Sequence, residues 1–228
     1  MDDLTHQKKP NDAILITGIL LAFLIPLGLT VAIGNVNVSY FDKLFYSRFF
    51  YWGTVLFLFF YARQVERGPL LIWPENNAGT KFFLSSVVIL YLLFIAAAIV
   101  SAIPMLFGWR ESNEVMKMIA RLLKGQSSMM FFIALTAGVT EEFIFRGYIL
   151  TRLLQIFKNP YIPVILSSIL FSALHYKFHS LREFIFTFLI GVIFSLYYIK
   201  YRNIKALMFT HFLIDFISLM LAQHLKMK

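Results

Sequence analysis

Long apolar runs alternate with short polar segments along the whole chain. A helix that crosses a bilayer needs about 20 mostly apolar residues, and each run reaches or approaches that length. We therefore predict seven transmembrane helices, with ends uncertain by several residues. The runs lie near residues 13–33, 45–62, 82–107, 128–150, 161–176, 184–200 and 204–224.

Two prolines and one amphipathic stretch interrupt this pattern. Pro26 and Pro104 lie inside apolar runs, where proline kinks or breaks a helix. The third run could therefore divide near Pro104 and give an eighth segment. Residues 109–126 place basic side chains opposite apolar ones, which predicts an amphipathic helix at the membrane interface. An ordinary surface helix is the equal alternative.

Composition supports a membrane protein. Of the 228 residues, 59% are hydrophobic and 14% are charged, against about 25% charged in soluble domains. The net charge of +9 is scattered between apolar runs, so it favours contact with anionic lipid and argues against nucleic acid as a partner. We expect an integral, multi-pass protein, as in the bacterial cytoplasmic membrane. Lys and Arg divide 11 against 10 between the two sides, so the positive-inside rule leaves the orientation undetermined.

Ionisable residues inside apolar runs are the best candidates for chemistry, because a charge at the centre of a spanning helix costs about 2.5 to 3.5 kcal/mol. Glu141 and Glu142 lie in the fourth run, His175 in the fifth, and His211 and Asp215 on one face of the seventh. A single histidine in a span often serves helix packing through a hydrogen bond. Three polar clusters on three helices favour a functional site. The absence of cysteine excludes a cysteine nucleophile and thiolate metal ligands.

The fourth run separates its two carboxylates. Glu142 and Arg146 are four residues apart, the favourable order for an ion pair, whereas Glu141 points about 100° away around the helix. Glu141 is thus left to act as a general base on water, with His175 orienting the same water and polar groups of the seventh run stabilising the oxyanion. The alternative is a charge network of both glutamates at the interface.

Three short motifs follow one another along these runs. They read Glu141-Glu142-x-x-x-Arg146, Phe171-x-x-x-His175 and His211-x-x-x-Asp215. In this order they resemble the CPBP family, also called Abi proteins, of CAAX prenyl proteases and bacteriocin-processing membrane proteins. The resemblance covers residues 128–224.

The resemblance implies an all-helical intramembrane endopeptidase. It assigns the general base to Glu141, the water-holding imidazole to His175, and the oxyanion site to His211 and Asp215. Structural support of this site would come from Glu142, Arg146 and Phe171.

Asp215 leaves two alternatives open, since family members carry Asn or Asp here and an ionised Asp only accepts hydrogen bonds. Asp215 would be protonated, or it would orient His211 through the ring N–H. We expect no cofactor. The alternative is zinc held by Glu141, His175, His211 and Asp215.

We therefore predict an all-α polytopic bundle of seven or eight transmembrane helices with an intramembrane catalytic cavity. Residues 1–127 would hold the first three helices and the interfacial helix, and residues 128–228 the catalytic core. The predicted function is hydrolysis of membrane-associated or prenylated peptides by glutamate-activated water. The alternatives are a zinc metalloprotease, a non-catalytic protein of bacteriocin self-immunity or peptide binding, and an ion or proton transporter.

Overall fold

The computed structural model describes residues 10–76, 79–109, 114–175 and 180–223, and within these ranges the secondary structure is helical. The elements are α1 (Asp12–Gly34), α2 (Tyr40–Gln64), α3 (Gly79–Ser101), α4 (Ile103–Leu106), α5 (Glu114–Leu122), α6 (Ser127–Glu142), η1 (Phe143–Leu150), α7 (Thr151–Ile156), α8 (Tyr161–Leu174), α9 (Leu181–Tyr201) and α10 (Ile204–Ala222).

Each of the seven predicted helices is present. The fourth is one continuous helix of 30 residues, Ser127–Ile156, built from α6, η1 and α7. Pro26 lies inside α1 without ending it, whereas the third run divides as expected near Pro104, which lies in the short α4. The predicted amphipathic helix corresponds to α5, and residues 110–113 of that prediction lie outside the described residues.

Five helical segments among the described residues are long and apolar enough to cross a membrane: α1, α3 with α4, the α6–α7 unit, α9 and α10. The other two predicted spans do not meet these criteria of length and apolar composition. α2 has 25 residues but includes charged residues and several tyrosines, and α8 has 14 residues, which is about 21 Å of helix. Large apolar side chains such as Leu92 and Ile99 are exposed on the outside. The protein is an integral, multi-pass helical membrane protein.

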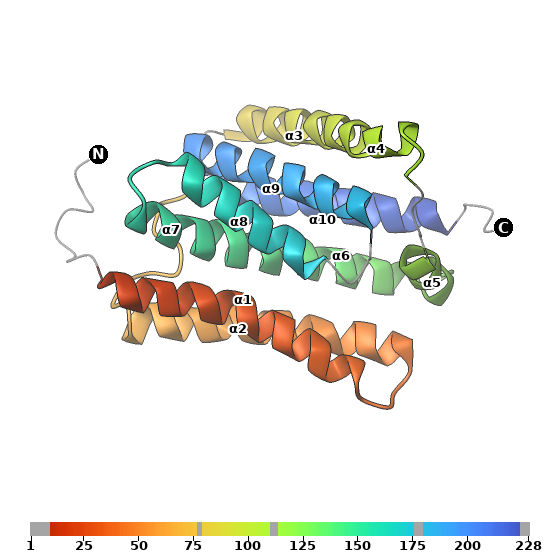
Figure 1. The fold of residues 1–228 in the computed structure, drawn as a ribbon, viewed down its shortest axis with the longest axis horizontal. Helices are drawn as coiled ribbons and strands as arrows, with labels where there is room; N and C mark the ends of the chain where they lie inside the picture. The colour runs from red at the N-terminus through yellow and green to blue at the C-terminus, as the bar shows by residue number, and fades with distance from the viewer. Residues whose placement is uncertain (1–9, 77–78, 110–113, 176–179, 224–228) are drawn as a thin grey trace.

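The long helices lie side by side, with α1 and α2 along one edge of the bundle, α3 along the opposite edge, and α5 across one end (Figure 1). α6 packs on α10, and α8 packs on α9. Two glycines permit these close approaches. A Cβ at Gly138 would lie 2.7 Å from the backbone nitrogen of Phe212 and 2.8 Å from the carbonyl oxygen of Met208, and one at Gly191 would lie 2.7 Å from the Cβ of Ser168. Small residues serve close helix packing in membranes in the same way.

The segment that follows Glu142 is wound as a π-helix, η1. A π turn holds more residues than an α turn, so it rotates the later side chains relative to the α-helical pattern, and such turns are frequent at functional sites. From Ile144 to Leu150 every residue is buried. The wide turn therefore lies in the packed centre of the bundle, directly after the two glutamates.

A second buried network stabilises the end of the bundle where α7 lies. Arg152 donates to the carboxylate of Glu66 at 2.7 Å and to the carbonyl oxygens of Pro69 and Leu70 at 2.9 and 2.6 Å. The Tyr148 hydroxyl donates to the same carboxylate. These bonds attach the segment after α2 to the α6–α7 unit.

Candidate active site

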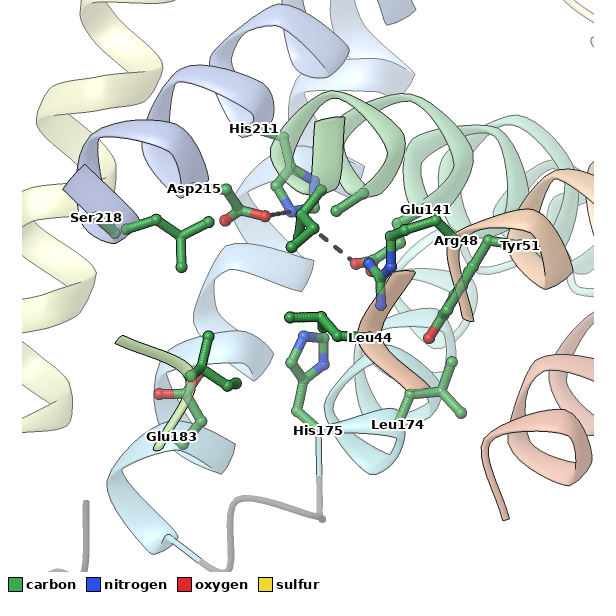
Figure 2. A pocket seen from close by; sticks show the side chains of 14 residues that line it. Leu44, Arg48, Tyr51, Glu141, Leu174, His175, Glu183, His211, Asp215 and Ser218 are labelled. Carbon is green, nitrogen blue, oxygen red and sulfur yellow. Dashed lines mark ion pairs between the residues drawn. The ribbon is translucent and has the colours of Figure 1, made fainter. Parts of the chain in front are cut away.

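A cavity of about 190 Å³ lies between α2, α5, α6, α9, α10 and the end of α8. All four residues predicted to carry chemistry, Glu141, His175, His211 and Asp215, line it (Figure 2). The other lining residues are Leu44, Arg48, Tyr51, Ile119, Ile133, Ala137, Leu174, Glu183, Ser218 and Leu219. The cavity thus brings together groups that are far apart in the sequence.

The two glutamates at the end of α6 have different surroundings. Glu142 is fully buried, and its Oε1 accepts from Nη1 of Arg146 at 2.9 Å, which confirms the predicted ion pair. The guanidinium of Arg146 lies between two rings, 4.5 Å from the centroid of Phe171 and 5.3 Å from that of Phe194. Glu141 faces the cavity instead. One carboxylate is therefore part of the packed interior, and its neighbour is accessible to a molecule in the cavity.

His211 is oriented by Glu142. Its Nδ1 lies 2.8 Å from Oε1 of Glu142, and because an ionised carboxylate only accepts, Nδ1 carries the hydrogen. The opposite nitrogen, Nε2, faces Oε2 of Glu141 at 4.0 Å and Oδ2 of Asp215 at 3.7 Å (Figure 2).

This geometry bears on one of the two alternatives for Asp215, the orientation of His211. The carboxylate that holds the ring N–H of His211 belongs to Glu142, and Asp215 lies beyond hydrogen-bond distance on the other side of the ring. The physical reason is the close packing of α6 on α10 at Gly138, because it brings the end of α6 against the histidine.

His175 lies at the end of α8 and approaches the cavity from the side opposite His211 (Figure 2). Its Nδ1 is 2.9 Å from the carbonyl oxygen of Phe171. A carbonyl only accepts, so Nδ1 carries the hydrogen and the lone pair of the neutral ring is on Nε2. The ring of Phe171 contacts both histidines, with centroid distances of 4.9 Å to His175 and 6.3 Å to His211. Phe171 therefore packs beside both imidazoles, where it can support both.

The described residues do not form a ready zinc site. Zinc needs three or four ligand atoms, with nitrogen and oxygen ligands at about 2.0 to 2.2 Å. Among the described residues, no three His, Asp or Glu side chains are grouped closely enough to hold a metal ion. Nδ1 of His211 is also engaged by Glu142.

Three polar residues of the cavity were not predicted from the sequence: Arg48 and Tyr51 of α2, and Glu183 of α9. Arg48 lies near the start of the apolar run 45–62 and close to Lys43, so the criterion of a charge at the centre of a span, which selected Glu141, did not select it. Glu183 follows Ser180 with the spacing of a helix cap, and its backbone N–H donates to the Ser180 hydroxyl at 3.0 Å. That spacing indicates a capping role, so nothing in the sequence indicated that the side chain of Glu183 faces the cavity.

Comparison with known proteins finds a family model that is similar to part of the chain. Residues 124–217 match the family model described as type II CAAX prenyl endopeptidase Rce1-like. All three motifs lie within the matched residues, and the match confirms the resemblance to CAAX proteases. No curated protein and no solved structure matches the chain at a significant level.

Proposed function

We propose that this protein is an intramembrane endopeptidase that hydrolyses membrane-associated or prenylated peptides with water activated by Glu141. One observation carries the proposal: Glu141, His175 and His211 line the same cavity between membrane helices. The similarity of residues 124–217 to prenyl endopeptidases supports the same reaction class.

In the proposed reaction, a water molecule lies between Glu141 and His175. Glu141 takes one proton, His175 accepts a hydrogen bond from the same water at Nε2, and the hydroxide adds to the peptide carbonyl carbon. His211 stabilises the resulting oxyanion, together with Asp215 if that carboxyl is protonated. The amine then leaves with the proton that Glu141 holds, and the carbonyl forms again.

The proposal is tested with purified protein in detergent and an internally quenched peptide that carries a farnesylated cysteine. Glu141→Gln keeps the size of the side chain and removes its basicity. General-base catalysis contributes about 10²- to 10⁴-fold, so we expect the cleavage rate to fall by at least that factor while the melting temperature is unchanged. Cleavage at the wild-type rate would exclude the assignment.

Glu75→Gln is the matched control. Glu75 lies outside the cavity and accepts from the backbone N–H groups of Ile204 and Lys205 at the start of α10, at 3.3 Å each. The amide oxygen of Gln can still accept one of these bonds, and the change lies outside the cavity, so this variant should cleave at the wild-type rate.

We further propose that the hydrolysis needs no metal. Dialysis against a strong zinc chelator should leave the cleavage rate unchanged, and elemental analysis should find less than stoichiometric zinc in active protein. Activity that is lost with the chelator and restored by zinc would instead support a metalloprotease. If the wild type binds the peptide but releases no product, the cavity belongs to a non-catalytic peptide-binding protein.

A further inference from the structure

The mechanism above assigns no role to the cation in the cavity, Arg48. This residue lies in α2 and is 7% exposed, and its guanidinium points into the cavity (Figure 2). Leu44, Arg48 and Tyr51 all line the cavity and are spaced as one helical face. A neighbouring face of α2 contacts α6, where Nε1 of Trp52 donates to the Thr136 hydroxyl at 3.3 Å. Arg48 is thus presented to the cavity by a helix in contact with the one that carries Glu141.

Arg48 differs from the two other deeply buried arginines in its partners. Arg146 is paired with Glu142, and Arg152 with Glu66. The hydrogen bonds of Arg48 to described residues come from Nε and Nη2, at 3.2 and 3.1 Å, and both go to the neutral hydroxyl of Ser47. No described carboxylate lies within 4.0 Å of its guanidinium. Carboxylates of Glu141 and Asp215 line the same cavity but form no ion pair with Arg48. Its guanidinium can therefore pair with a negative charge that forms or binds in the cavity.

On the other wall of the cavity, such a charge meets one donor, the Nε2–H of a protonated His211, and this donor lies beside two carboxylates. Nε2 of His211 has carboxylate oxygens of Glu141 and Asp215 at 4.0 and 3.7 Å. An ionised carboxylate offers no donor and repels an oxyanion. A guanidinium remains charged and has five N–H donors. Arg48 therefore carries the positive charge and the donors that Asp215, as a carboxylate, does not provide.

We infer that Arg48 is a catalytic residue that donates hydrogen bonds to the oxyanion of the tetrahedral intermediate, together with Nε2 of His211. The inference rests on the proposed peptidase function. When the water oxygen bonds to the carbonyl carbon, its proton goes to Glu141 and the carbonyl π pair moves onto oxygen beside Arg48. When the C–N bond breaks, that pair forms the carbonyl again, and the amine takes the proton from Glu141.

The test compares Arg48→Met, Arg48→Lys and the control Arg63→Met, which removes an exposed arginine from the last turn of the same helix. The probe is the farnesylated peptide, made once with a free and once with an amidated C-terminus. Loss of one oxyanion donor costs about 10²- to 10³-fold in kcat. We expect this fall in Arg48→Met with both peptides and with KM within about threefold of the wild type, a smaller fall in Arg48→Lys, and no change in Arg63→Met.

A second measurement does not depend on turnover. A phosphinate analogue of the peptide carries a tetrahedral, anionic oxygen, as the intermediate does. Arg48→Met should weaken binding of this analogue by a factor similar to its loss in kcat. In the Glu141→Gln background, it should leave binding of the uncleaved peptide unchanged.

Several results would overturn the inference. An unchanged kcat excludes a catalytic role. A rise in KM confined to the peptide with a free C-terminus shows that Arg48 binds the substrate carboxylate instead. A lower melting temperature with equal losses for analogue and peptide shows a structural role. The two proposals fail in distinguishable ways. If Glu141→Gln cleaves at the wild-type rate, the proposed function is wrong. If Glu141→Gln is inactive and Arg48→Met is fully active, only the assignment of Arg48 is wrong.

Discussion

At the scale of single residues, one carboxylate oxygen of Glu142 binds two neighbours, the guanidinium of Arg146 and the imidazole of His211. Its Oε1 is 2.9 Å from Nη1 of Arg146 and 2.8 Å from Nδ1 of His211, and all three side chains are buried. Hydrogen bonds with a charged member are about twice as strong as neutral ones. Glu142 therefore determines both the charge balance of the buried guanidinium and the orientation of the histidine.

This arrangement predicts that Glu142→Gln lowers stability much more than Glu141→Gln does. The amide of Gln can still accept from His211, but it leaves the Arg146 guanidinium without its counter-charge inside the bundle. Removing one member of a buried ion pair typically costs about 3 to 5 kcal/mol. Thermal unfolding in detergent should show a clear drop in melting temperature for Glu142→Gln and almost none for its neighbour. Equal melting temperatures would mean that the ion pair does not contribute to stability.

Sequence reasoning predicted the part of this cluster that is local. The spacing of Glu142 and Arg146 indicated their ion pair, because helical geometry alone places residues four apart on one face. The contact between Glu142 and His211 joins helices that are 69 positions apart in the chain. It depends on how α6 and α10 pack, so the pattern of one helix cannot indicate it.

At the scale of helices, α10 packs closely against α6 at Gly138, which has no Cβ. A Cβ at Gly138 would meet backbone atoms of Phe212 and Met208 at 2.7 and 2.8 Å, and backbone atoms of a packed helix cannot rotate away as a side chain can. Gly138 lies one turn before Glu141, and Phe212 is the neighbour of His211. Added volume at this point separates the two helices where they form the site.

We therefore predict that Gly138→Ala reduces the cleavage rate by about 10²-fold, since a displacement near 1 Å at catalytic groups has an effect of that order. Gly53→Ala in α2 is the matched control, because a Cβ there has no neighbour within 4 Å. Alanine also favours a helix over glycine by up to about 1 kcal/mol, so the control should be active and at least as stable as the wild type. Normal cleavage by Gly138→Ala would show that the helices adapt without moving the site.

Periodicity predicted where helices lie, but not every detail of their geometry. The seven apolar runs located all the long helices because a bilayer fixes the length of a span. The π-helical turn of η1 could not be predicted in this way. Its residues are buried on every side from Ile144 to Leu150, so no polar face marks the change of register.

At the scale of the whole molecule, apolar side chains cover the outer faces of the helices as well as fill the packed core. Buried polar groups form the network around Glu66 and Arg152 and the cavity around Glu141, while large apolar side chains cover the outer faces of the helices. In lipid this arrangement is stable, because the surroundings are as apolar as leucine. The sequence predicted this environment from composition, but its even division of Lys and Arg could not give the orientation in the membrane.

The outer face of α3 gives a direct test of this environment. Leu92 lies near the middle of α3 and is 59% exposed, so in a membrane it contacts lipid. A lysine at the centre of a spanning helix costs about 2.5 to 3.5 kcal/mol on insertion scales. We predict that Leu92→Lys strongly reduces the amount of protein that stays in membranes after a carbonate wash, while Leu92→Phe behaves as the wild type.

Val36→Lys is the matched control, since Val36 is exposed to a similar extent, 49%, but lies between α1 and α2 outside any candidate span. The two lysine variants have the same added charge and differ in the depth at which it is placed. If exposure alone mattered, both would be retained equally. A wild-type level of Leu92→Lys in washed membranes would show that this face of α3 contacts water or protein instead of lipid, and would require a second subunit or an aqueous channel beside it.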